Sequence, residues 1–503
     1  MYALVNKHGC CAKNPYTNSE KTEYRKYEVF LANVDANNLY GNALRHHLPI
    51  GNFHYLEPEE YNHINWKTIK LDTEIGYFVI CDLQYPPTVQ EKTKNFPLAP
   101  EIHQISGHMF TSYMKQMLSR NRLSRNPASI NPEGCLPRKK LLTTCWKKIE
   151  YGVHFAALQC YLKYGLIIDT IHRVIQFKQD PIFRDFINYN TQRRTVAAND
   201  FEKDFYKAKN CCLFGKSLEN KHNRCDIKLC NDHTKFRRVA SQAKFRCARI
   251  FSRDLVAAEM TKANVVLDAP AAIGVTVLDI SKVIMYDLAY EQFPRYEELF
   301  GCKINIIGGD TDSFFLEVIG VDLYNVLFPL MLTDGLLDSS NYPCNHLLYS
   351  SAHKAQLDCI KDEFAGKIYD EFILLRPKSY SMRCVENRRA DKRRSKGVPY
   401  RNVKRFKHED YKSVFLTECE ITSKCRRMQS ELHTIYNIEQ IKIALSHADD
   451  KRAWLSNNYS VPYGYHLLKN QPFLEDEEED NETEEPTRTL EMIYEEIMGT
   501  KSV

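Results

Sequence analysis

The chain has 503 residues, enough for two to four structural units, and 43% of them are hydrophobic, so it can bury a large core and is not wholly disordered. Its net charge is only +5, but residues 475–485 hold nine acidic side chains, and the rest of the chain carries +14. That distribution favours a polyanionic partner. No apolar run is long enough for a membrane helix and the first 30 residues show no signal-peptide pattern, which speaks against membrane insertion and secretion.

Seventeen cysteines are scattered along the chain without a C-x-x-C pair. The neighbours Cys10–Cys11 and Cys211–Cys212 are too close in sequence for an ordinary disulfide. We therefore expect free thiols in a reducing, intracellular compartment, and neither a structural zinc ion nor an iron–sulfur cluster. The basic run at 388–396 suits a nuclear import signal and phosphate contacts equally well, so the nucleus stays open as a compartment.

The N-terminal half is predicted to mix strands and helices. After a polar, turn-rich start, β-type runs at 28–35 and 75–85 predict strands, and Pro86 closes the second. The pattern from about 104 to 165 predicts helix, interrupted at 126–137.

The chain continues with a charged, amphipathic stretch at 183–219 that predicts a helical hairpin. A buried helix is predicted at 272–290 and a strand–turn–strand unit at 303–318. Helices are expected to follow the basic run at 383–407, before an acidic tail that is disordered at its start.

The strongest local signal is the run Gly308-Gly309-Asp310-Thr311-Asp312-Ser313 between two apolar stretches. Two glycines allow a tight turn, which projects two carboxylates. Because like charges this close repel, the pattern favours a cation between them, and oxygen ligands without a nearby His or Cys favour Mg²⁺ or Mn²⁺. An ordinary Asp/Gly-rich turn is the alternative reading of these residues alone.

A second signal lies at the end of the first predicted strand, where Asp35 is followed by Tyr40 five residues later. One carboxylate here plus one or two at the predicted hairpin would complete a two-metal site for in-line phosphoryl displacement. Taken alone, Asp35 fits equally well as the N-cap of the next helix.

A third signal is a row of cations on the predicted helical hairpin. Lys203 and Lys207 stand at i, i+4 on one helix face, with Arg193 and Arg194 upstream. A triphosphate opposite a metal site needs such a row. A solvated basic face is the alternative.

In this order the three signals resemble motifs A, B and C of the family B DNA polymerases. The segments DANNLYG, FEKDFYKAKNCCLFGKSLEN, DISKVIMYDLAY, GGDTDSFF and LRPKSYSM are most similar to the protein-primed branch, in particular the polymerases of Polinton/Maverick and adintovirus-like elements. The resemblance runs from about Asp35 to His466.

Carried over position by position, the resemblance implies a catalytic set of Asp35, Asp310 and Asp312. Asp35 and Asp312 would be the main ligands of two Mg²⁺ or Mn²⁺ ions, with Asp310 nearby at the primer end. Tyr40 corresponds to the steric gate that excludes a ribose 2′-hydroxyl.

The same comparison implies nucleotide- and DNA-binding residues. Lys207 corresponds to the motif B lysine on the incoming triphosphate, and the implied helpers are Lys203 and Arg194. Contacts with DNA are implied for Lys378 and Tyr380 of the K-x-Y motif at the primer terminus, and for Gly215, Lys216 and Ser313.

The implied fold is α+β, a polymerase right hand with an antiparallel palm sheet, helical fingers and a helical thumb. The expected N-terminal segments are a remnant of the link to an exonuclease domain (1–34), the palm with motif A (35–104) and a helical insertion of the protein-primed type (105–180). The fingers (181–250) are expected to carry motif B and a second insertion at 221–248. The palm with motif C and K-x-Y (251–385), the thumb (386–470) and the acidic tail (471–503) follow.

The sequence also departs from the family pattern. Cys211 and Cys212 stand where motif B has Asn and a small residue, Phe214 replaces a tyrosine, and Gly308 replaces an aromatic, which is expected to loosen the hairpin. Family members carry a proofreading exonuclease domain before motif A, whereas 34 residues precede Asp35 here, so no exonuclease activity is expected.

The resemblance thus implies a DNA-directed DNA polymerase that extends a primer 3′-hydroxyl, for replication of a viral or transposon genome. Its expected partners are a DNA primer–template, deoxynucleoside triphosphates and a terminal protein primer, with no membrane. A catalytically inactive DNA-binding remnant is the alternative, suggested by Cys211, Cys212 and Gly308. A reverse transcriptase shares the two-aspartate hairpin, but the K-x-Y segment 66 residues after Asp312 speaks against it.

Overall fold

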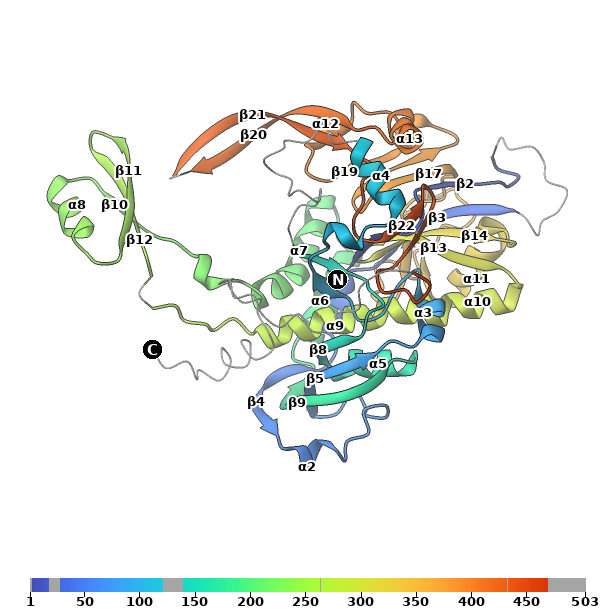
Figure 1. Cartoon of the computed structure of the whole chain (residues 1–503), viewed down its shortest axis with the longest axis horizontal. Coiled ribbons are helices and arrows are strands. Elements are labelled where there is room, and N and C mark those ends of the chain that lie inside the picture. The colour runs from blue at the N-terminus through green and yellow to red at the C-terminus, as the bar shows by residue number, and fades with distance from the viewer. Residues whose placement is uncertain (1, 18–27, 121–138, 263, 432, 469–503) are drawn as a thin grey trace.

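The computed structural model describes residues 2–17, 28–120, 139–262, 264–431 and 433–468 (Figure 1). The acidic run and the predicted interruption at 126–137 lie outside these residues. Within the described part of the chain, no helix is both long and apolar enough to cross a membrane.

A six-stranded sheet carries the residues of motifs A and C, and its strand order is β1-β13-β14-β3-β16-β15. All neighbours are antiparallel except β15 and β16. The predicted strand at 28–35 and strand–turn–strand unit at 303–318 are confirmed, and the expected boundary between residues 34 and 35 falls inside β3. The strands are β1 (Ala3–Val5), β3 (Val29–Ala36), β13 (Lys303–Asp310), β14 (Ser313–Ile319), β15 (Leu337–Asp338) and β16 (Ile360–Asp362).

Side chains alternate between the two faces of this sheet along each strand, and both faces are buried. Phe30 and Val34 of β3 join a core with Tyr286 of α9 (Ala271–Asp287) and with α10 (Phe293–Phe300). Leu31 points to the opposite face and joins a core with Phe372 of a second sheet. The predicted buried helix at 272–290 is confirmed, and a short π-helix (Leu288–Gln292) continues it.

The second sheet packs against that opposite face, in the order β19-β18-β17-β2. Its outer side is covered by α13 (His408–Thr417), whose Tyr411 and Val414 contact Leu375. In the hairpin β17–β18, Lys378 of the K-x-Y segment lies in the turn and Tyr380 lies on β18. The strands are β2 (Gly9–Cys11), β17 (Tyr369–Arg376), β18 (Ser379–Cys384) and β19 (Lys392–Ser395).

A four-stranded sheet in the order β4-β9-β5-β8 lies on the far side of α9 (Figure 1). The predicted strand at 75–85 is confirmed, but the helical insertion predicted at 105–180 is wrong over much of its length, where β7, β8 and β9 lie. β9 is rich in β-branched residues and pairs with β5 along its length, which favours a strand over a helix. The strands are β4 (Leu48–Leu56), β5 (Ile75–Gln84), β8 (Lys148–His154) and β9 (Ile167–Asp180), and helix α5 (Phe155–Lys163) follows β8.

The predicted helical hairpin at 183–219 is confirmed as α6 (Arg184–Thr195) and α7 (Asp200–Ser217). Leu213 and Phe214 of α7 pack with Val277 and Ile280 of α9, in one core with α1 (Leu39–Leu44). The hairpin is thereby fixed to the helix that also supports the six-stranded sheet.

The residues predicted as a second insertion fold as a small sheet in the order β10-β12-β11, covered by α8 (His233–Ala240). Its strands are β10 (Asp226–Cys230), β11 (Phe245–Ser252) and β12 (Leu255–Met260). The expected end of the insertion at 248 and of the fingers at 250 both cut through β11.

The helical thumb predicted for 386–470 is wrong beyond α13. A long antiparallel ribbon follows, made of β20 (Ile421–Glu431) and β21 (Thr434–Leu445). Ile435, Ile438 and Ile441 recur every three residues, which imitates a helix face, but β-branched residues pair better in a strand. The ribbon extends toward the second insertion (Figure 1), where His433 Nε2 lies 2.9 Å from a Glu259 carboxylate oxygen of β12.

Shorter elements complete the described part. These are α2 (Pro58–Tyr61), α3 (Pro87–Thr93), β6 (Glu101–His103), a 3₁₀ turn (Gly107–Met109), α4 (Ser112–Arg120), β7 (Lys140–Leu142), a 3₁₀ turn (Lys221–Asn223), a π-helix (Leu323–Leu327), α11 (Phe328–Thr333), a 3₁₀ turn (Arg388–Ala390), α12 (Tyr400–Val403), β22 (Ala453–Ser456) and β23 (Tyr459–Val461).

Candidate functional site

The turn between β13 and β14 presents Asp310 and Asp312. Thr311 at its apex has a φ of 65°, a conformation that a β-branched residue rarely adopts. Its N–H donates to the Tyr2 carbonyl (2.9 Å), and the Asp312 N–H donates to the Asp310 carbonyl (2.8 Å). One hydrogen bond from outside the turn and one within it therefore hold a strained backbone in place, as is common at functional sites.

The two glycines before this turn are closely packed. A Cβ at Gly309 would lie 2.5 Å from the Ser313 carbonyl oxygen, so the hairpin requires glycine there. At Gly308 it would lie 3.1 Å from the Leu4 carbonyl and 3.2 Å from Leu374. The expectation that Gly308 loosens the hairpin is therefore wrong, because strand β1 and the second sheet fill the space of a larger side chain.

Asp35 ends up beside this turn. It pairs in register with Ser313, and the Ala36 N–H donates to the Asp312 carbonyl (2.7 Å). The two strand ends thus place Asp35 and Asp312 next to each other. Asn38, rather than Asp35, is the N-cap of α1, so the helix-cap reading of Asp35 is wrong.

Burial and mutual repulsion act on both carboxylates. Burial and then the charge of Asp312 raise the pKa of Asp35 well above its usual range. Burial raises the pKa of Asp312 as well, and the charge of Asp310 adds to that rise against a backbone hydrogen bond that opposes it. Lys207 lowers both pKa values. The site is therefore a place where additional positive charge is favoured.

Two charged residues near Asp35 were not predicted from the sequence. Lys361 of β16 pairs in register with Asp35, and the Glu363 N–H donates to the Asn33 carbonyl (2.8 Å). The charge of Glu363 raises the pKa of Asp35, whereas the charge of Lys361 lowers it. β16 is only three residues long and carries no motif, so its pairing with β3 is the only signal that brings these residues here.

Tyr40 lies on α1 at the wall of the site. Its ring stacks on Phe214 of α7, with centroids 4.2 Å apart and planes at 17°. Burial, followed by the charges of Asp312 and Asp310, raises the pKa of Tyr40 to about 12. The Cys211 thiol, one turn before Phe214, lies 4.0 Å from the Asn38 side-chain oxygen. The motif A and motif B residues therefore face each other.

The remaining cations of α6 and α7 are placed less closely. Lys203 pairs with Asp200 at the start of α7 (3.0 Å), and Lys216 pairs with Glu219 near its end (3.1 Å). Arg194 is near enough to Cys211 to lower its pKa, although burial, the largest effect, raises it. Gly215 borders open space, with no atom within 4 Å of where its Cβ would stand. Lys207 is thus the cation of this hairpin that acts on both Asp35 and Asp312.

The K-x-Y residues come from the second sheet. Lys378, in the β17–β18 turn with φ of 64°, places its Nζ 3.1 Å from an Asp310 carboxylate oxygen. Tyr380 packs edge-on against Phe315 of β14 (5.1 Å between centroids). The structure therefore joins the predicted primer-side residues to the two-aspartate turn.

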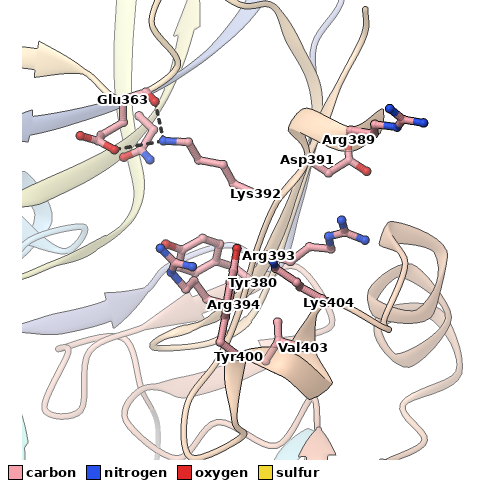
Figure 2. Close-up of a pocket in the computed structure, with 11 residues that line it drawn as sticks. Glu363, Tyr380, Arg389, Asp391, Lys392, Arg393, Arg394, Tyr400, Val403 and Lys404 are labelled. Carbon is pink, nitrogen blue, oxygen red and sulfur yellow. Dashed lines mark hydrogen bonds and ion pairs between the residues drawn. The ribbon is translucent and has the colours of Figure 1, made fainter. Parts of the chain in front are cut away.

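A cavity of about 460 Å³ opens beside Tyr380, between the sheets and α12 (Figure 2). Lys392 donates to Glu363 at its edge (3.0 Å), and the ring of Tyr400 lies between Arg394 and Lys404, 5.9 and 4.8 Å from its centroid. Its cationic lining residues are Arg389, Lys392, Arg393, Arg394 and Lys404. Five cations against two acidic residues, Glu363 and Asp391, make the lining of the cavity net positive.

The side chains around Asp35 and Asp312 decide whether a metal ion can bind at this site. Among the residues that the structure describes, no three His, Cys, Asp or Glu side chains meet closely enough to hold an ion by themselves. Mg²⁺ commonly takes one or two carboxylates and completes its shell with water and substrate phosphates. Asp35 and Asp312, two neighbouring half-buried carboxylates, fit that pattern.

No protein-family model matches the chain, and no curated relative matches its sequence. Three solved structures of Phi29 DNA polymerase are similar in fold. The complex with primer-template DNA and incoming nucleotide is 12% identical, with a TM-score of 0.44 over 86% of this chain and 61% of that chain. The orthorhombic crystal form is 12% identical (TM-score 0.46, 88% and 61%).

The complex of the same polymerase with single-stranded DNA is 13% identical, with a TM-score of 0.43 over 87% of this chain and 60% of that chain. The chain thus spans about 61% of the length of the polymerase to which it is similar.

Proposed function

We propose that the protein is a DNA-directed DNA polymerase of the protein-primed family B type, which adds deoxynucleotides to a primer 3′-hydroxyl. One observation carries the proposal: Asp35 and Asp312 meet at paired strand ends and lie opposite Lys207 and Tyr40. Paired carboxylates opposite a cation and an aromatic wall suit a triphosphate whose α-phosphate is attacked in line.

On the nucleotide side, Lys207 neutralises part of the triphosphate charge, as it does for the carboxylates in the free protein. Tyr40 is held by its stack on Phe214 and cannot turn away without losing that contact. A ring fixed in this way excludes a ribose 2′-hydroxyl by its shape. Lys203, once it exchanges Asp200 for phosphate, and Arg194 assist from the same hairpin.

On the primer side, Lys378 holds Asp310 in the free protein and is positioned to exchange that partner for a primer phosphate. Tyr380 lines the cationic cavity, which we expect to continue this surface (Figure 2). Their cations contact the DNA backbone and not the bases, which gives affinity without sequence preference. Gly215, Lys216 and Ser313 complete the DNA-binding set.

Asp35 and Asp312 would hold Mg²⁺ or Mn²⁺, with Asp310 beside them. When bound, the metal supplies activation of the primer 3′-hydroxyl and neutralisation of phosphate charge. The protein itself contributes the alignment, because the β3–β14 pairing and the Gly309 turn fix where the two carboxylates stand.

The biological setting forms part of the proposal. Replication of a viral or transposon genome with a terminal protein as primer agrees with the sequence resemblance. An intracellular, reducing compartment is supported by the cysteines of the described residues, which are all free thiols.

Primer extension on a DNA template with Mg²⁺ and four deoxynucleotides tests the proposal. We expect extension by the wild type, none by Asp312→Ala or the isosteric Asp312→Asn, and near-normal primer–template binding by both variants. Asp72→Ala, an exposed aspartate before β5, is the matched control and should extend like the wild type. Extension by Asp312→Ala above a few per cent of wild type contradicts the assignment.

The same assay separates the alternatives. Wild-type protein that binds primer–template but does not extend it identifies the inactive remnant. Efficient extension on an RNA template identifies a reverse transcriptase.

A further inference from the structure

The face of α7 opposite Lys207 carries an exposed stripe of aromatic and basic residues. Successive members of the stripe are four, four, three and four residues apart. They therefore lie along one side of the helix, from near its start to near its end. None of its members is acidic. The stripe consists of Phe201, Phe205, Lys209, Cys212 and Lys216.

The two aromatic rings of the stripe are exposed to solvent. Phe201 is 80% exposed and Phe205 is 47% exposed. They stack on each other, with planes at 14° and centroids 6.5 Å apart, and the Lys209 ammonium lies 4.7 Å from the Phe205 centroid. A core role is thereby excluded for Phe201, and a pair of stacked rings in solvent marks an interaction surface.

The neighbouring helix continues the same chemistry. Tyr206 of α7 stands edge-on to Phe205, and the Arg193 guanidinium of α6 lies 5.9 Å from the Tyr206 centroid and donates to its hydroxyl (3.3 Å). Tyr189 of α6 is 58% exposed. Rings and cations therefore alternate across both helices of the hairpin.

This alternation fits one kind of partner. A protein helix needs a continuous apolar groove, whereas here cations lie beside two of the rings, those of Phe205 and Tyr206. Unpaired bases stack on aromatic rings whatever their identity, and the phosphates between them pair with Lys and Arg. Residues one turn apart on a helix rise about 6 Å, so Phe201 and Phe205 are spaced for successive bases of an extended strand.

We propose that this outer face of the α6–α7 hairpin is a stacking platform for unpaired single-stranded DNA. The inference rests on the proposed function, in which the unpaired strand is the template ahead of the primer terminus. Lys207, on the opposite face of α7, acts on Asp35 and Asp312, so the platform is one helix diameter, about 10 Å, from the nucleotide wall. On this proposal, a template strand passes this face before it enters the site.

The test uses the full chain with Phe201→Ala/Phe205→Ala and a fluorescein-labelled 20-nucleotide oligonucleotide followed by anisotropy. We expect the affinity for single-stranded DNA to fall about 10- to 100-fold, because each stacked base contributes substantially to binding. The matched control Tyr459→Ala removes a ring that is 48% exposed on β23 and should bind like the wild type. Phe201→Trp/Phe205→Trp should restore binding.

A second measurement compares primer–template with template overhangs of one and of 20 nucleotides. The wild type should bind the long overhang more tightly, and the double alanine variant should bind both alike. If the double variant folds poorly, Phe201→Glu replaces it, since that side chain is mostly in water and its new charge repels phosphate.

Unchanged affinity of the variants for single-stranded DNA overturns the inference, as does an equal loss on both overhangs. Self-association of the wild type that the variants abolish, with DNA binding unchanged, overturns it in favour of a protein contact. The binding assay remains readable if the wild type fails to extend primers, so failure of the proposed function and failure of the platform are distinguishable.

Discussion

Three glycines near the candidate site differ in the space around them, and this difference predicts a graded series of alanine variants. At Gly309 the added Cβ would lie 2.5 Å from a backbone carbonyl, that of Ser313, which cannot rotate away. At Gly308 the nearest atoms are 3.1 to 3.2 Å away, and two of them belong to the side chains of Leu374 and Phe315. At Gly215, on α7, no atom lies within 4 Å.

The magnitudes follow from these contacts. Gly309→Ala must open the hairpin, and overpacking together with a weakened Asp310–Ser313 pairing should cost about 2–4 kcal/mol of unfolding free energy. Gly308→Ala displaces side chains by a few tenths of an ångström and should cost about 1 kcal/mol. Gly215→Ala removes a helix-interior glycine with open space around it, and should stabilise by about 1 kcal/mol.

Urea unfolding followed by tryptophan fluorescence measures the series, because Trp454 is fully buried in the core beneath the six-stranded sheet. Primer extension by Gly309→Ala should fall about 100-fold, since the turn that carries Asp312 moves relative to Asp35. Any order of stability other than Gly215→Ala, wild type, Gly308→Ala, Gly309→Ala refutes the packing argument. Normal extension by a destabilised Gly309→Ala refutes the link between turn and chemistry.

Three further changes probe the walls of the site and the fold around it. Tyr40→Val should raise ribonucleotide incorporation about 10- to 100-fold relative to deoxynucleotides, because the stacked ring no longer fills the space of a 2′-hydroxyl, and unchanged discrimination would contradict its role. Lys378→Ala removes a half-exposed ion pair and should change the unfolding free energy by less than about 1 kcal/mol. The same variant should raise the KM for primer–template, with little effect on the KM for nucleotide. Burial alone would raise the pKa of Glu371, but the hydrogen bond from His408, together with Lys412 and Arg383, outweighs it and holds that pKa at about 2. Glu371→Gln should therefore destabilise by about 3 kcal/mol at pH 7, and the difference from wild type in urea unfolding should shrink as the pH falls from about 4.5 toward 2, where the wild-type carboxylate becomes protonated.

Local signals predicted the parts of the site that depend on local sequence. The apolar strands around the Gly309 turn, the strand that ends at Asp35 and the amphipathic pattern of α6–α7 all formed where expected. Each is determined by residues within a few positions of one another: turn glycines, alternating apolar side chains and helical spacing.

Pairing between strands far apart in the chain determined the parts of the structure that local sequence patterns did not predict. β16 brings Glu363 and Lys361 to Asp35 only because its three residues pair with β3, and a strand of that length has no periodicity to recognise. β21 imitates a helix with its isoleucines three residues apart, and only its pairing with β20 along eleven positions makes it a strand. Where local spacing and β-branched content disagreed, tertiary pairing followed the β-branched content.

Two of the cations that act on the carboxylates come from elements that pack independently. Lys207 stands on α7, which is anchored through Phe214 to the core of α1 and α9, whereas Lys378 stands on the β17–β18 turn, anchored through Tyr380 to Phe315. Asp310 pairs with Lys378 directly, while Lys207 acts on Asp35 and Asp312. A change at one cation therefore leaves the anchor of the other intact, which is why substitutions on the nucleotide side and the primer side should separate in their effects on the two KM values.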